Sequence, residues 1–192
     1  MSNFHVRHLP HYCPIGQPLF VTWRLHGSMP AGRCYPAATE SGKAFLAMDR
    51  ILDSATTGPL YLSQPDPVTV VVNAIRNREA NDYDLHAFVV MANHVHLLFT
   101  PKRDVSKILH SLKRFTAREC NRILGRTGQP FWQDESYDRL VRDPAEFKRI
   151  VKYIEMNPVR AGLADYPEAF PWSSARRIDN PPQVGNLHYT RV

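Results

Sequence analysis

The stretch YDLHAFVVMANHVHLLFTP, residues 83–101, decides the fold. Its two apolar runs, on either side of residues 92–93, predict two antiparallel strands joined by a short turn. In the second run His94 and His96 are two residues apart, and side chains at this spacing on a strand point to the same face. The residues between and after them face the other way. The stretch therefore predicts a hairpin whose second strand carries a pair of imidazoles on one face.

The segments around this hairpin have patterns of strands and helices. Residues 19–27 alternate between apolar and polar side chains, which predicts a strand with one buried face. Helical spacing of apolar residues predicts helices at 40–54, 67–80, 104–124 and 144–157, and residues 128–142 are typical of a loop and a short strand. Asp104 and Asp143 are the expected N-caps of the last two helices, and Pro158 ends the final one. This order predicts an α+β fold: a ferredoxin-like antiparallel sheet with helices packed mainly on one face.

The chain length of 192 residues and its 43% hydrophobic content suit one domain with a sizeable core. We expect an N-terminal arm over residues 1–18, a folded domain over 19–164 and a Pro-rich C-terminal tail over 165–192. The ends of the domain follow from where the periodic patterns start and stop.

Charge and cysteine content narrow the function classes. Lys and Arg outnumber Asp and Glu by 24 to 18, a net charge of +6, which favours polyanionic partners but is shared by many unrelated soluble proteins. Cysteines stand at 13, 34 and 120 without any CxxC pair, so neither a disulfide framework nor a zinc knuckle is indicated. The sequence has no apolar signal segment and no run of 18 apolar residues. We therefore expect a cytoplasmic protein without a membrane partner.

The predicted helix at 144–157 presents a second pair of polar groups. Tyr153 and Asn157 are four residues apart, so they lie one turn above the other at the edge of the apolar face. A tyrosine in this position is often a packing residue, and an asparagine often ends a helix. The helix by itself does not decide between packing and chemistry.

The imidazole pair and this helix together suggest a mechanism. A tyrosine hydroxyl is a weak nucleophile at neutral pH because its pKa is about 10, so attack on phosphorus needs a cation to neutralise the developing charge. Nitrogens of His94 and His96 and the carbonyl oxygen of Asn157 would supply three ligands for Mg²⁺ or Mn²⁺. The product would be a 5′-phosphotyrosine on Tyr153, which conserves the bond energy for religation.

The predicted helix at 104–124 has a basic flank beside its apolar side. On the apolar side we expect burial of Val105, Ile108, Leu112, Phe115 and Ile123. Such a flank matches a nucleic-acid backbone, and it is also typical of an ordinary solvated helix. Further arginines lie close in sequence to the proposed site. The residues predicted to bind DNA are Lys107, Arg114, Arg118, Arg122, Arg139, Arg142 and Arg160.

Two segments resemble a known family. MANHVHLLF (91–99) resembles the MPNHVHLL segment of the HUH (His-hydrophobic-His) single-tyrosine transposases. FWQDESYDRLVRDPAEFKRIVKYIEMNPVRAGL (131–163) is similar to the C-terminal block of the REP-associated tyrosine transposases, including its YIxxNPVRAGL pattern. The resemblance extends over about residues 16–175 and is strongest from 83 to 163.

This resemblance implies a ferredoxin-like catalytic domain over 19–164, dependence on Mg²⁺ or Mn²⁺, and cleavage of single-stranded DNA near imperfect hairpins. By position His94 and His96 match the family's metal-binding histidines, Tyr153 the nucleophile and Asn157 a third polar ligand. Wider relatives commonly have Gln at this last position, so the shorter Asn affects the exact geometry. Ala92 replaces the usual Pro before the histidines, which affects the turn and leaves the ligands intact. The family includes dimers that share active sites, so both a monomer and a homodimer stay open.

Two other functions stay open. A non-catalytic or domesticated nucleic-acid-binding module can use the same scaffold, although it has no use for Tyr153 beside two histidines. A small metal hydrolase, in which His94 and His96 activate water, would need a further carboxylate or histidine nearby. Glu155 lies on the wrong side of its predicted helix to supply one.

Overall fold

The computed structural model describes residues 14–29, 41–55 and 58–176. The N-terminal arm up to residue 13, part of the loop after the first strand, and the tail from 177 lie outside the described residues. The elements are, in order, β1 (Leu19–Leu25), α1 (Ser41–Asp53), η2 (Tyr61–Ser63), α2 (Pro65–Arg76), β2 (Tyr83–Val90), β3 (His94–Pro101), α3 (Val105–Ile123), β4 (Trp132–Leu140), α4 (Pro144–Glu155), α5 (Asn157–Arg160) and η3 (Pro167–Ala169).

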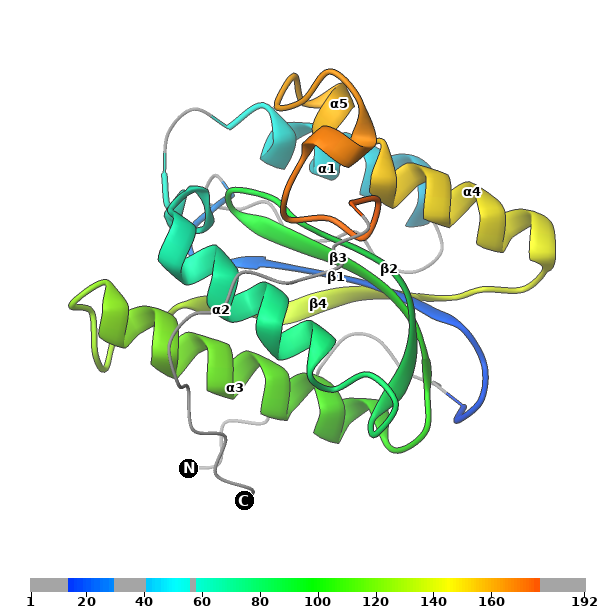
Figure 1. Cartoon of the computed structure of the whole chain (residues 1–192), viewed down its shortest axis with the longest axis horizontal. Helices are drawn as coiled ribbons and strands as arrows, with labels where there is room; N and C mark the ends of the chain where they lie inside the picture. Colours follow the sequence, from blue (N-terminus) through cyan, green and yellow to red (C-terminus); the bar gives the residue numbers. More distant parts are fainter. Residues whose placement is uncertain (1–13, 30–40, 56–57, 177–192) are drawn as a thin grey trace, which may run out of the picture.

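The four strands form one sheet in the order β2-β3-β1-β4, and every neighbouring pair is antiparallel. The predicted hairpin is present as β2 and β3, with Val90 opposite Val95 at its closed end. Helix α2 leads into β2, and helix α3 connects β3 to β4 (Figure 1). These two crossovers leave β1 between β3 and β4. This is the ferredoxin-like arrangement, so the predicted α+β class and antiparallel sheet are confirmed.

Helices cover both faces of the sheet, which differs from the expectation that they pack mainly on one (Figure 1). The crossover helices α2 and α3 cover one face, and α1 and α4 cover the other. All residues of β1 are consequently buried, and the prediction of a strand with a single buried face is wrong. The alternation in β1 reflects two different buried environments: Val21 and Trp23 enter the core under α2 and α3, whereas Phe20 packs with α1 and α4.

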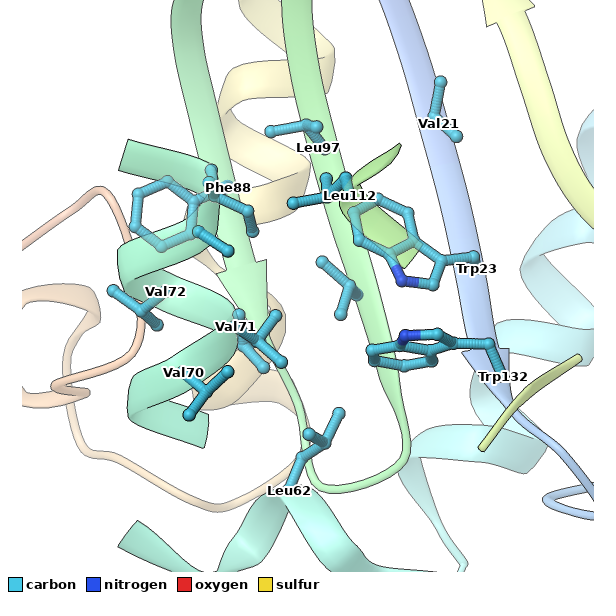
Figure 2. Close-up of a cluster of buried hydrophobic side chains, with 14 of the residues drawn as sticks. Val21, Trp23, Leu62, Val70, Val71, Val72, Phe88, Leu97, Leu112 and Trp132 are labelled. Atoms are coloured by element: carbon cyan, nitrogen blue, oxygen red, sulfur yellow. The ribbon is translucent and has the colours of Figure 1, made fainter. Parts of the chain in front are cut away.

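The core under α2 and α3 is apolar and aromatic. Three successive valines of α2 (residues 70–72) are buried, and the rings of Trp23 and Trp132 meet edge to face with centroids 6.1 Å apart (Figure 2). Leu97 of β3 and Leu112 of α3 are fully buried in the same cluster. This cluster contains more of the buried apolar side chains than the cluster under α1 and α4, so it contributes more of the hydrophobic stabilisation.

Side-chain caps set the starts of the two long helices that follow the hairpin. Asp104 accepts a hydrogen bond from Lys107 N at 2.9 Å, and Asp143 accepts one from Glu146 N at 2.7 Å, as predicted. Helix α4 ends at Glu155, and Asn157 begins the short helix α5, instead of ending α4 as predicted. Pro158 is tolerated there because the first turn of a helix needs no backbone donor.

The described part of the predicted tail packs against the sheet. Val90 N donates to Trp172 O at 2.9 Å, and Ser174 N donates to Phe88 O at 2.9 Å. Ser173, between these two residues, is fully buried and forms an isolated bridge with Val89. The edge strand β2 is thus covered at this end. None of the helices among the described residues has the length and apolar composition to cross a membrane.

Candidate active site

His94 and His96 lie on β3, project toward α1 and α4, and are fully buried. Their Nε2 atoms are 3.1 Å apart, and the two rings meet edge to face with centroids 4.7 Å apart. The spacing of two residues on a strand therefore brings the imidazoles together as the sequence predicts. Two ring nitrogens that converge in a buried space form the beginning of a metal site.

The other ring nitrogens have partners that orient each imidazole. Asn93 Nδ2 donates to the carbonyl oxygen of Leu52 at 3.0 Å, so Asn93 Oδ1 faces His94 Nδ1 at 2.7 Å. Because that amide oxygen only accepts, His94 Nδ1 carries the proton and its Nε2 presents a lone pair to the cluster. Thr22 Oγ1 lies 2.7 Å from Nδ1 of His96 and holds the second ring. Contacts of this kind orient histidine ligands in metalloproteins.

Helix α1 adds two carboxylates that the sequence analysis missed. Asp49 Oδ1 lies 3.2 Å from His96 Nε2 and 3.6 Å from His94 Nε2, and Asp53 Oδ1 lies 3.6 Å from His94 Nε2. One possible ligand atom from each of Asp49, His94 and His96 lies within 4.8 Å of the others. The two acids are four residues apart on a helix that was predicted, which places them on one face, but nothing local indicates which surface that face meets.

Tyr153 and Asn157 complete the cluster from α4 and the start of α5. The Tyr153 hydroxyl donates a hydrogen bond to Asp49 Oδ2, and its ring meets that of His96 with centroids 5.7 Å apart. Asn157 is fully buried, and its Nδ2 lies 3.3 Å from both Asp49 Oδ2 and His96 Nε2. An inverted amide would direct the Asn157 oxygen into the cluster instead.

Burial and mutual charge shift the pKa values of these groups. Burial lowers the pKa of His94 to about 3, helped by the charge of His96, so His94 is neutral at physiological pH. Burial would raise the pKa of Asp49, but His96 and the hydrogen bond from Tyr153 outweigh it, so this pKa lies below the ordinary value. Burial and the adjacent Asp49 raise the pKa of Asp53 to about 7. Burial and the same carboxylate raise the pKa of Tyr153 above its ordinary value.

The donor atoms fit a divalent cation. Asp49 Oδ1, Asp53 Oδ1 and Asn157 Oδ1 are buried and have no hydrogen-bond partner. Unpartnered buried oxygens cost free energy unless something else binds them. The two aspartate oxygens lie within 3.6 Å of imidazole nitrogens, and inversion of the Asn157 amide would bring its oxygen to the same place. A mixed set of oxygen and imidazole donors suits Mn²⁺, and the oxygen donors of the set also suit Mg²⁺.

A cavity of about 420 Å³ adjoins the cluster and is lined by Leu46, Asp49, Arg50, Asp53, Ser54, Tyr153, Arg160 and Ala161. The Arg160 guanidinium carbon lies 4.3 Å from the centroid of the Tyr153 ring, and Arg160 Nη2 donates to the Tyr153 carbonyl oxygen at 2.6 Å. Tyr153 is therefore partly buried, and it lines the cavity beside the positively charged guanidinium of Arg160.

The other basic residues predicted to bind DNA lie away from the cluster. Lys107, Arg114, Arg118 and Arg122 are exposed on α3, on the far side of the sheet. Two of them pair with Glu119, at 2.8 Å from Arg118 and 3.2 Å from Arg122.

Arg139 and Arg142, which are also predicted to bind DNA, lie at the end of β4 and just after it. Arg139 pairs with Glu146 at 2.5 Å, while Arg142 is exposed. On α3, Ile123 is 37% exposed, so its predicted burial is wrong, because the helix end extends beyond the sheet. Of the basic residues predicted to bind DNA, only Arg160 lines the cavity beside the cluster.

Comparisons with known proteins agree with this architecture. Residues 70–157 match the family described as "Transposase IS200 like". The chain is similar to the solved structure described as "Structure of the REP associates tyrosine transposase bound to a REP hairpin", with a TM-score of 0.58 and 18% identity over 96% of this chain and 95% of that one. At this identity the similarity concerns the fold. No match was found among curated protein sequences. The resemblance seen in the sequence is thus confirmed: residues 70–157 match the IS200-like transposase family, and the fold of the chain is similar to that of a REP-associated tyrosine transposase.

Proposed function

We propose that this protein cleaves and transfers single-stranded DNA through a covalent bond to Tyr153, with a divalent cation bound at the histidine pair. The observation that carries the proposal is one carboxylate with two sets of partners. Asp49 faces both imidazoles with Oδ1 and accepts the Tyr153 hydrogen bond with Oδ2. A nucleophile and a cation site are thereby joined within one buried cluster.

The proposed reaction is a transesterification at phosphorus. As the bond from Tyr153 Oη to phosphorus forms, the bond from phosphorus to the 3′ oxygen breaks. The phenol loses its proton and the departing 3′ oxygen takes one up, so the products are a 5′-phosphotyrosine and a 3′-hydroxyl. The reverse attack by another 3′-hydroxyl transfers the strand.

The chain's own residues prepare this step. A Mg²⁺ or Mn²⁺ ion held by His94, His96 and the oxygens of Asp49 or Asn157 would neutralise charge that develops on the phosphate. Arg160, beside the Tyr153 ring, can bind a phosphate oxygen in the cavity. The ring contacts of Tyr153 with Phe20, Phe45 and His96 restrict its rotation, so the hydroxyl stays at the cluster.

The proposed substrate is single-stranded DNA that carries a hairpin. The family match and a similar fold solved with a REP hairpin support this choice. The net charge of +6 and the exposed cations of α3 add a second support, because backbone contacts dominate affinity for nucleic acids.

The test is incubation with hairpin-bearing single-stranded DNA and Mn²⁺ or Mg²⁺, followed by denaturing electrophoresis. We expect a protein–DNA conjugate with the native chain and none with Tyr153→Phe, which keeps the ring and removes the nucleophile. The matched control is Tyr166→Phe, at an exposed tyrosine outside the cluster, which should form the conjugate as the native chain does. Conjugate formation by Tyr153→Phe would contradict the proposal.

A second candidate, a metal-dependent hydrolase, is favoured by Asp49 and Asp53, since these acids supply the carboxylates that such a site needs. The same assay separates the two functions. A hydrolase would still cut DNA after Tyr153→Phe, and no protein would be attached to the product.

A further inference from the structure

Asp49 reaches the cluster from a part of the chain outside the matched family segment, which begins at residue 70. Two contacts fix α1 on either side of it. Phe45, four residues earlier, stacks on Tyr137 with ring centroids 4.3 Å apart. Three residues later, the Leu52 carbonyl oxygen accepts the hydrogen bond from Asn93. The position of Asp49 is therefore set by packing at one end and by a hydrogen bond at the other.

The two oxygens of this carboxylate have separate partners. Oδ2 accepts hydrogen bonds from the Tyr153 hydroxyl and from Asn157 Nδ2. Oδ1 has no hydrogen-bond donor and faces the Nε2 atoms of the histidine pair. Asp49 is only 3% exposed, so solvent does not satisfy the free oxygen. The Tyr153 hydroxyl needs only one acceptor, which a neutral side chain could provide. A buried carboxylate costs more free energy, so its second oxygen calls for another partner.

We propose that Asp49 is a positioning residue, which holds the Tyr153 hydroxyl beside the cation site by using one oxygen for each. The inference rests on the proposed function and adds to it a residue that lies outside the family match. The aromatic rings around Tyr153 restrict its side-chain rotation, and the hydrogen bond to Asp49 fixes the direction of the O–H group. The same carboxylate adds negative charge where the cation would bind.

An asparagine at this position cannot do both jobs. If its amide oxygen accepts from Tyr153, its NH₂ group points at the imidazole nitrogens and at the cation site. If the amide is inverted, its NH₂ group faces Tyr153 and the Tyr153 hydroxyl loses the acceptor that fixes the direction of its O–H group. Asp49→Asn therefore removes the paired function with almost no change in volume. Asp66→Asn is the control, because it makes the same chemical change at an exposed carboxylate in the first turn of α2, outside the cluster.

The experiment measures three quantities on the full chain: Mn²⁺ affinity without DNA by calorimetry, affinity for hairpin DNA, and the single-turnover rate of conjugate formation at saturating Mn²⁺ and DNA. For Asp49→Asn we expect Mn²⁺ affinity about 10–100-fold lower, DNA affinity within about threefold of native, and a rate at least about tenfold lower. Asp66→Asn should keep its rate within about threefold of native. Asp49→Ser, a smaller replacement, is measured as well, with circular dichroism as the check of folding.

Two outcomes would overturn the inference. Either the Asp49 variants conjugate as fast as Asp66→Asn at saturating Mn²⁺, or their DNA affinity falls by the same factor as their rate, which would make Asp49 a substrate-binding residue. Failure of the proposed function is a different result, because then the native chain forms no conjugate at all.

Discussion

On strand β3, Val95 and Leu97 face α2 and α3, whereas His94 and His96 face α1 and α4. The first side of the sheet contains an apolar core, and the second contains buried imidazole, carboxylate and amide groups. Burying such polar groups costs free energy, which the first side must offset. One strand thus serves two purposes by alternation, and changes at neighbouring residues should have separable effects on stability and on chemistry.

The largest effect should come from a pair of neighbouring substitutions. His96→Ala should raise the activation free energy of cleavage by several kcal/mol, which lowers the rate on the order of 10²–10⁴-fold. The variant should keep the fold. Leu97→Ala should cost about 2–5 kcal/mol of unfolding free energy, while the folded protein still cleaves. Urea denaturation and single-turnover cleavage measure the two quantities. Equal losses of stability and rate in both variants would refute the separation of the two sides.

Cation binding should stabilise the polar side. At Mn²⁺ a hundredfold above its dissociation constant, we expect a gain of about 2.7 kcal/mol. For a chain of this size that corresponds to a rise in melting temperature of roughly 5–11 °C. A chelator should reverse the rise, and the double variant His94→Ala/His96→Ala should not show it. A similar rise in the double variant would place the cation elsewhere.

The buried charge of Asp53 should appear as a pH effect in the absence of a cation. Its pKa is about 7 in the folded chain, above the ordinary value of about 3.9. Between these values the folded state retains a proton on Asp53 that the unfolded state has released. The contribution of neutral Asp53 to the free energy of unfolding is therefore fully present below pH 4 and is lost as pH rises through 7. Relative to native, Asp53→Asn should therefore gain stability from pH 4 to 7, by at most about 1.4 kcal/mol per pH unit. Urea unfolding with chelator tests this, and a difference that does not change with pH would contradict it.

The smallest effect should come from the surface of the apolar side. If α3 contacts DNA, Arg114→Ala should weaken binding a few-fold and reduce the salt slope of log K by about 0.7–0.9 for the lost phosphate contact. Arg118→Ala should lose less, because Arg118 already pairs with Glu119. Titrations from about 50 to 200 mM salt measure both variants. Binding that does not depend on salt would exclude the basic flank of α3 from the interface.

Local signals in the sequence were sufficient for the hairpin, the caps and the imidazole pair, because period-two alternation and N-cap chemistry act within a few residues. The contact of Tyr153 and Asn157 with that pair followed from helical spacing together with the family resemblance. Asp49 was missed because its role depends on where α1 docks, which is a long-range contact without any local pattern. The expectation of one buried sheet face failed for a related reason, since Thr22 is polar and yet fully buried beside His96.

The acceptor that fixes the Asn93 amide, and through it the protonated nitrogen of His94, is a main-chain atom of Leu52. Replacing the side chain at 52 leaves that carbonyl in place, so substitutions there spare the tautomer. Inserting or deleting one residue in α1 would rotate the helix by about 100° and remove the carbonyl from reach. The number of residues in α1 between Phe45 and Leu52 therefore matters more for the His94 tautomer than the identity of the side chain at 52.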